Sequence, residues 1–222
     1  MYKAVIFDLD NTLLDRDASV KSFIRKQYDR LRTWLSHIPK EVYIDRFIDL
    51  DARGYVWKDK VYQQLIEEFN INLSWETLLQ DYIDEFHHHC VAFPNLIPTL
   101  DELKKSSYKL GMITNGKGQF QLDNIRALGI EDYFDCILIS EWEGIKKPNP
   151  LIFRRALEEM QVSPKEAIFV GDHPVNDVEG ARNVGMIGAW KKDSQWKDVN
   201  ADYIVEDLID LLDILKEGIA TK

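Results

Sequence analysis

Short apolar runs alternate with single helical segments over the second half of the chain, and this alternation constrains the fold more than any other feature. The β-rich runs cover residues 108–114, 135–140, 166–172 and 186–191, and a last short run covers 203–205. A crossover helix between successive strands is typical of parallel pairing, because a tight hairpin joins only antiparallel strands. The pattern therefore predicts an α/β fold, with a Rossmann-like parallel sheet and helices on both of its faces.

The helices between these runs are predicted from apolar residues at intervals of three and four. They cover residues 97–106, 120–129, 149–161, 176–185 and 206–217. Gly129 is expected just past the end of one of them, because glycine readily adopts the left-handed conformation that follows many helix C-termini.

A further apolar run, residues 3–8, precedes a stretch of different character. Residues 16 to about 90 contain no convincing strand and are rich in aromatic side chains. Their apolar residues follow the spacing of four helices, with Ser74 as the N-cap of the fourth. We therefore expect two domains: an α/β core formed by residues 1–16 and 92–222, and an inserted all-helical cap formed by residues 17–91.

Polar residues follow four of the predicted strands. In chain order they are Asp8 and Asp10, then Thr114, Asn115 and Gly116, then Lys146 and Lys147, then Asp172, Asn176 and Asp177. The carboxyl ends of parallel strands meet at one edge of a sheet, where ligands of such folds bind. Acids at the end of an apolar strand are costly unless something pairs with them. The pattern therefore indicates a polar site at this edge.

This set of side chains suits phosphoryl transfer. A carboxylate can attack phosphorus and form an aspartyl-phosphate. A hard divalent cation, with Mg²⁺ as the first choice, takes oxygen ligands and would shield the attacking carboxylate from the phosphate. The hydroxyl of Thr114 and the amides of Asn115 and Gly116 could hold the transferring oxygens, while a lysine would balance the negative charge.

Four motifs resemble those of the haloacid dehalogenase-like (HAD) hydrolase superfamily. They are DLDNT at 8–12, ITN at 113–115, KKPNPLIF at 146–153 and GDHPVND at 171–177, in the order of that superfamily. The resemblance covers residues 1–17 and about 92–200. The helical insert stands where the superfamily has a helical, C1-type cap, although no motif supports that match.

Matched position by position, the resemblance implies three catalytic residues. Asp8 is similar to the nucleophile, which is also a metal ligand. Asp10 is similar to the general acid and base, with its backbone carbonyl on the metal. Lys147, the lysine directly before proline, is similar to the stabilising cation.

The resemblance also implies binding roles. Thr114 is similar to the phosphate-binding hydroxyl, and Asp172 to the side-chain metal ligand. Asp177 is similar to a second acid that orients metal-bound water or the lysine, and Asn176 is placed with it.

Asp10 favours a phosphatase. The dehalogenases of the superfamily carry an aromatic residue two positions after the nucleophile and need no metal, whereas this chain has an acid there. A proton donor helps a phosphate ester to leave but is not needed for halide, and such help is worth ~10²–10⁴ in rate. We therefore predict a phosphomonoester hydrolase that forms an aspartyl-phosphate.

The expected substrate is a small phosphorylated metabolite, with a nucleoside 5'-monophosphate as the first choice on family analogy alone. The alternatives are a sugar-phosphate phosphatase or a phosphomutase. A 2-haloacid dehalogenase and a non-enzymatic binding protein are less favoured, because neither the acids nor the lysine are lost.

Composition bounds the partners. The formal net charge of −10 argues against nucleic-acid polymers and anionic membranes as partners. No apolar run reaches ~18 residues, so no membrane span is expected. Cys90 and Cys136 form no disulfide pattern, and no basic, apolar signal segment precedes the first strand. We therefore expect a cytoplasmic protein with no obligate protein partner.

Overall fold

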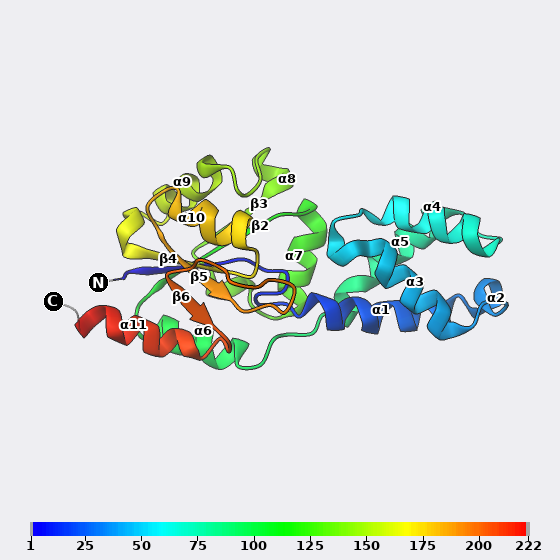
Figure 1. Cartoon of the computed structure of the whole chain (residues 1–222), viewed down its shortest axis with the longest axis horizontal. Coiled ribbons are helices and arrows are strands. Elements are labelled where there is room, and N and C mark those ends of the chain that lie inside the picture. The colour runs from blue at the N-terminus through cyan, green and yellow to red at the C-terminus, as the bar shows by residue number, and fades with distance from the viewer. Residues whose placement is uncertain (1, 221–222) are drawn as a thin grey trace. The chain divides into compact units, whose positions relative to one another are not determined.

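A parallel sheet of six strands forms the α/β part of the protein (Figure 1). The computed structural model describes residues 2–220, with side chains up to residue 216. The strands are β1 (Ala4–Phe7), β2 (Lys109–Thr114), β3 (Cys136–Ile139), β4 (Ala167–Gly171), β5 (Ile187–Lys191) and β6 (Tyr203–Val205). They lie in the order β3-β2-β1-β4-β5-β6, and each neighbouring pair is parallel. The predicted fold class is thus confirmed.

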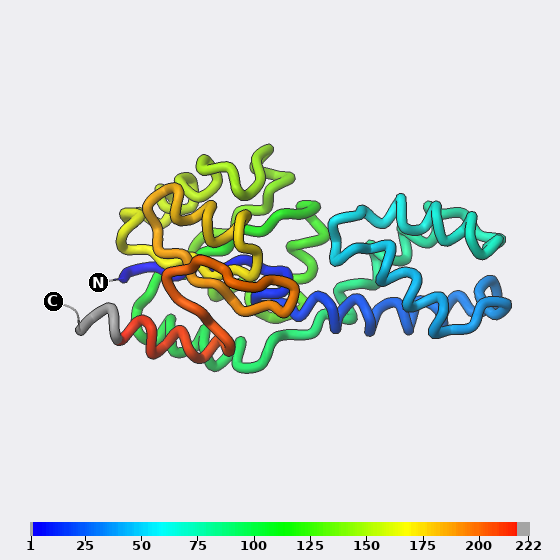
Figure 2. Tube along the Cα trace, viewed as in Figure 1, coloured from blue at the N-terminus to red at the C-terminus, as the bar shows by residue number. Residues whose placement is uncertain are grey.

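The chain divides into two compact units. One consists of Met1–Asp15 with Ala92–Lys222, and the other of Arg16–Val91. Figure 2 shows the chain leaving the first unit after β1, running through the helical unit in blue and cyan, and returning to the sheet. These limits lie within one residue of the domain limits expected above.

β1 is at the centre of the sheet. Phe7 is in register with Met112 of β2 on one side and with Val170 of β4 on the other. Every residue of β1 is fully buried, which explains why the strand is continuously apolar and does not alternate. The order of the strands reverses between β1 and β4, and in such sheets the ligand crevice lies beyond the carboxyl ends at the reversal.

Helices cover both faces of the sheet. Those of this unit are α6 (Leu96–Lys105), α7 (Gly118–Ala127), α8 (Ser140–Glu143), α9 (Pro150–Glu159), α10 (Gly180–Arg182) and α11 (Asp210–Ala220). α9 and α10 lie above the sheet in Figure 1, whereas α6 and α11 lie below it. Phe153 of α9 packs edge-on against Phe169 of β4, with ring centroids 5.2 Å apart. No helix among the described residues combines the length and the apolar character needed to cross a bilayer.

The predicted helices differ from the observed ones mainly at their first turns. The segment expected as a helix over 176–185 is a π-helix, Pro174–Glu179, followed by the short α10. α11 begins at Asp210 and not at residue 206; in the turn before it, the N–H groups of Glu206 and Asp207 donate to the Asp210 carboxylate. Gly129 follows α7 with a φ of 68°, as predicted for a C-terminal glycine.

The second unit is all-helical. Its helices are α1 (Arg16–Arg30), α2 (Arg32–Leu35), α3 (Lys40–Asp51), α4 (Lys58–Phe69) and α5 (Trp75–Glu85), with 3₁₀ turns at Ala52–Gly54 and Phe86–His89. The first of the four expected helices, over residues 20–35, is divided between α1 and α2. The Ser74 hydroxyl accepts the N–H of Thr77 at 3.3 Å, which confirms Ser74 as the N-cap of α5.

Aromatic side chains form the core of this unit. The ring of Tyr82 lies 5.0 Å from the ring of Phe23 and 5.0 Å from that of Phe86. All three are at most 2% exposed. The Phe23–Tyr82 pair meets edge to face, which adds a favourable contact to the burial of apolar surface, whereas Tyr82 and Phe86 are tilted to each other.

A buried group of charges lies beside this core. Both terminal nitrogens of Arg16 donate to the Asp51 carboxylate, at 2.9 and 3.0 Å, and the Lys58 ammonium contacts the same carboxylate. All three residues are buried. Burial works to raise the pKa of Asp51, but Arg16 and Lys58 outweigh it and lower that pKa.

We expect Asp51→Asn to lower the free energy of unfolding of the helical unit by about 3–5 kcal/mol, because it leaves two buried cations beside a neutral amide. Glu41 on the same helix is a matched control: it also accepts both terminal nitrogens of an arginine, Arg25, but on the surface. Glu41→Gln is expected to cost at most about 1 kcal/mol. Urea unfolding followed by fluorescence measures both, and equal losses for the two variants would contradict the prediction.

Candidate active site

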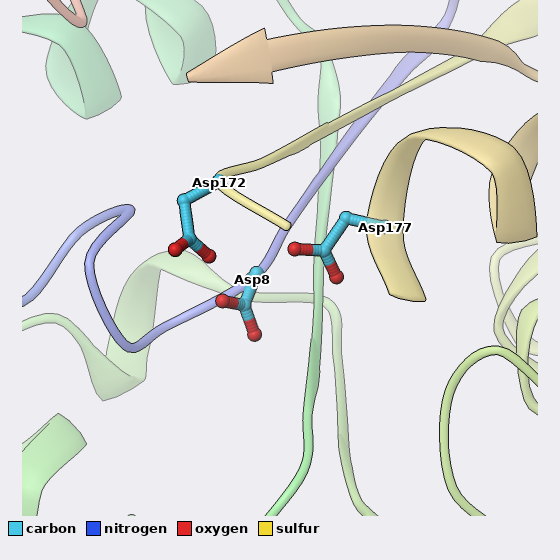
Figure 3. Close-up of side chains that lie close together, drawn as sticks. All are labelled: Asp8, Asp172 and Asp177. Atoms are coloured by element: carbon cyan, nitrogen blue, oxygen red, sulfur yellow. The ribbon is translucent and has the colours of Figure 1, made fainter. Parts of the chain in front are cut away.

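Three carboxylates meet where β1 and β4 end. Asp8 follows β1 directly, and its N–H donates to the carbonyl of Val170 at 2.9 Å. Asp172 follows β4 directly, and Asp177 lies on the π-helix. Their side chains turn towards one another (Figure 3), and each offers an oxygen within 4.8 Å of the others. The strand order therefore brings Asp8 next to two acids that lie more than 160 residues further along the chain.

Lys147 is the cation among these acids. Its Nζ lies 2.6 Å from Oδ1 of Asp8 and 2.7 Å from Oδ1 of Asp177. The side chain is buried, whereas Lys146 beside it is exposed. The structure thus brings Lys147, and not Lys146, to the acids.

The acids carry more negative charge than the lysine balances. Burial raises the pKa of Asp8 to about 7, with Lys147 opposing the rise and Asp177 adding to it. Burial, Asp177 and Asp8 together raise the pKa of Asp172 to about 9. Burial works to lower the pKa of Lys147, but Asp177 and Asp8 raise it, so the ammonium stays charged.

The three carboxylates fit a divalent cation. They supply hard oxygen ligands, which Mg²⁺ and Ca²⁺ prefer, and the raised pKa values of Asp8 and Asp172 show that further positive charge would be stabilised there. The side chain of Asp10 is not in this group of acids. Its expected part in metal binding is through the backbone carbonyl and stays a prediction.

Two residues after β2 are engaged with other parts of the site. Asn115 binds the backbone of Lys147 at two points: its Oδ1 accepts the Lys147 N–H at 2.9 Å, and its Nδ2 donates to the Lys147 carbonyl at 3.1 Å. The N–H of Gly116 donates to Oγ of Ser140 at 3.0 Å. Asn115 therefore fixes the segment that carries the lysine, and its expected contact with phosphate, like that of Gly116, stays a prediction.

Asp177 is held from both sides. One of its oxygens pairs with Lys147, and the other accepts the N–H of His173 at 2.9 Å. Nδ1 of His173 in turn accepts the N–H groups of Val175 and Asn176, which caps the π-helix. A Cβ at Gly171 would lie 2.4 Å from the Asp177 carboxyl group, so only glycine allows this approach. The side-chain role expected of Asn176 stays a prediction.

Gln121 of α7 is a site residue that the sequence did not reveal. It is 2% exposed, and its Nε2 donates to Oδ2 of Asp10 at 2.8 Å and to Oγ1 of the fully buried Thr114 at 2.7 Å. The sequence did offer one signal: Gln121 lies three and four residues before Asn124 and Ile125, and it therefore shares the buried face of α7 with them.

Comparison with known proteins decides the family. The family model described as haloacid dehalogenase-like hydrolase matches residues 5–190. The chain belongs to this family. A HAD phosphatase from Thermococcus onnurineus is 32% identical, with a TM-score of 0.68 and coverage of 96% of this chain and 97% of that one.

Two further relatives of this HAD-family chain differ in activity. The glyceraldehyde 3-phosphate phosphatase of Pyrococcus furiosus is 32% identical over 96% of this chain and 93% of its own. A 2-haloacid dehalogenase from Pseudomonas syringae is 27% identical, with a TM-score of 0.67 and coverage of 98% and 100%. The family therefore needs a residue-level argument to separate the two chemistries.

The raised pKa of Asp172 predicts a change of stability with pH in the absence of metal. The folded state holds a proton on this acid up to a pH of about 9, whereas the unfolded chain loses it near pH ~3.9. The folded state binds more protons between these values, so this contribution to stability is lost as the pH rises.

We therefore expect Asp172→Asn, which never ionises, to gain stability relative to the wild type between pH ~5 and pH ~9, by at most about 1.4 kcal/mol per pH unit. Urea unfolding in EDTA at several pH values measures the gain. Glu67→Gln, at an exposed position, is the control, and its free energy of unfolding should change with pH as that of the wild type does. A gain for Asp172→Asn that does not change with pH would refute the prediction.

Proposed function

We propose that the protein is a Mg²⁺-dependent phosphomonoester hydrolase that acts on small sugar phosphates through an aspartyl-phosphate. The observation that carries the proposal is the setting of Asp8. This buried carboxylate pairs with Lys147 at 2.6 Å and lies at the reversal of strand order beside Asp172 and Asp177. Asp10, two residues later, is not part of this cluster, and its carboxylate instead accepts a hydrogen bond from Gln121.

The proposed reaction has two steps. An oxygen of Asp8 attacks phosphorus while the bond from phosphorus to the ester oxygen breaks, and Asp10 gives its proton to the departing alkoxide. Asp10 then takes a proton from water, which attacks phosphorus and releases inorganic phosphate and the Asp8 carboxylate. Thr114 donates its hydroxyl to a phosphoryl oxygen, and Lys147 stabilises charge beside Asp8.

Asp8, Asp172 and Asp177 are the side chains that would hold Mg²⁺, together with the carbonyl of Asp10. A bound divalent cation supplies positive charge that offsets the repulsion between Asp8 and the phosphate. The helical unit Arg16–Val91 follows the strand that carries the nucleophile, and we assign it the role of a cap that excludes water and contacts the leaving group.

The preferred substrate class changes from the one expected above. A nucleoside 5'-monophosphate was the first choice, but the relatives do not support it. The relative from Pyrococcus furiosus is named for a three-carbon sugar phosphate and matches nearly the whole chain. The alternative stated with the first choice, a sugar-phosphate phosphatase, is therefore the better supported one.

Asp10 supports a phosphatase over a dehalogenase. Its carboxylate is held by Gln121, as suits a group that transfers a proton to an ester leaving group. A halide leaves without a proton, so a dehalogenase has no use for an acid there.

Asp8→Asn is expected to lower the hydrolysis of p-nitrophenyl phosphate in Mg²⁺ by at least ~10³-fold, because the amide is a poor nucleophile. The release of inorganic phosphate measures it. Asp132→Asn, at an exposed position, should keep wild-type activity. Full turnover by Asp8→Asn would overturn the assignment of the nucleophile. A 2-haloacid assayed beside the phosphate ester tests the dehalogenase alternative, since the wild type should release no halide.

Mg²⁺ should raise the melting temperature of the wild type, and more so at pH ~9 than at pH ~6, because metal binding must displace protons from Asp8 and Asp172. Asp172→Ala should weaken this response and shift the Mg²⁺ dependence of activity to concentrations at least ~10-fold higher. Calorimetry and a Mg²⁺ titration measure the two effects. A titration of Asp172→Ala that matched the wild type would exclude Asp172 as a ligand.

A further inference from the structure

One buried amide joins two groups of the proposed site, the carboxylate of Asp10 and the hydroxyl of Thr114. Nε2 of Gln121 lies 2.8 Å from Oδ2 of Asp10 and 2.7 Å from Oγ1 of Thr114. Asp10 follows β1 and Thr114 ends β2, so the contact ties together two neighbouring strand ends. It is made from a third element, α7.

The orientation of this amide is fixed by its partners. A primary amide has two N–H groups and one carbonyl. Both N–H groups of Gln121 are used on Asp10 and Thr114, and its Oε1 accepts Nδ2 of Asn124 at 3.3 Å. The opposite orientation would set the carbonyl oxygen against the Asp10 carboxylate, which is repulsive.

This orientation decides what the two neighbours can do. Because Oγ1 of Thr114 accepts a hydrogen bond from Gln121, its own proton is directed to another acceptor, as phosphate binding requires. Because Oδ2 of Asp10 is held, Oδ1 is the oxygen left to exchange a proton. The Gln121 side chain thus fixes both the direction of the Thr114 hydroxyl proton and the oxygen of Asp10 that can exchange a proton.

We propose that Gln121 is a positioning residue that holds the general acid Asp10 and the phosphate-binding hydroxyl of Thr114 in a single hydrogen-bonded frame. This inference rests on the proposed phosphatase function. Its consequence is specific: loss of Gln121 should slow esters with poor leaving groups far more than esters with good ones, because only the former need a well-placed proton.

The test uses Gln121→Leu, which removes both donors at similar volume, and Gln121→Met, which keeps an unbranched chain, in case the first variant does not fold. Gln119→Leu is the matched control, since Gln119 is exposed on the same helix and donates to Asp123. The substrates are p-nitrophenyl phosphate, whose leaving group needs little protonation, and glycerol 3-phosphate, whose leaving group is an alkoxide. Inhibition by inorganic phosphate reports on Thr114.

We expect Gln121→Leu to lower kcat on glycerol 3-phosphate by about 10²-fold, with a several-fold smaller loss on p-nitrophenyl phosphate and weaker inhibition by phosphate. Gln119→Leu should match the wild type throughout. Equal losses on the two esters, or no loss, would overturn the role of Gln121 while leaving the phosphatase intact. A wild type that releases phosphate from neither ester would instead refute the proposed function.

Discussion

The ammonium of Lys147, buried between the carboxylates of Asp8 and Asp177, is the interaction on which the arrangement of the site depends. It joins the end of β1, the segment before α9 and the π-helix after β4. A buried charge is tolerated only with a close partner of opposite sign, and removal of one partner typically costs about 3–5 kcal/mol. Other features serve this cluster: Asn115 fixes the backbone of Lys147, and Gly171 makes room for Asp177.

The same cluster shows how stability and chemistry are linked. Lys147 balances only part of the charge of the surrounding acids, and Asp8 and Asp172 therefore have raised pKa values. A site with this excess of negative charge favours a bound cation, and a cation there would reduce the repulsion between the acids and a phosphate. The apolar strands around it keep water away, which strengthens every electrostatic contact inside.

The sequence predicted the sheet well because the strands are local features. β1 and β4 are buried on both faces and therefore appear as continuous apolar runs. The acids that follow them could be placed at one edge from topology alone. The π-helix at Pro174–Glu179 could not be predicted, because it depends on the cap supplied by His173 and on the pairing of Asp177. Gln121 was missed for a similar reason, since its partner Asp10 lies 111 residues earlier in the chain and comes near only through the pairing of β1 with β2.

The two ends of the inserted helical unit are held together within the α/β unit. Leu14 forms an antiparallel bridge with Ala92, and the N–H of Phe93 donates to the carbonyl of Leu13 at 3.0 Å. The insertion therefore leaves and re-enters the α/β unit at neighbouring points, as a short loop would. The entropic cost of closing a loop grows only slowly with loop length, so the length of the insertion has little effect on the sheet. Insertions or deletions among residues 16–91 can accumulate over evolution without disturbing the strands that carry the acids.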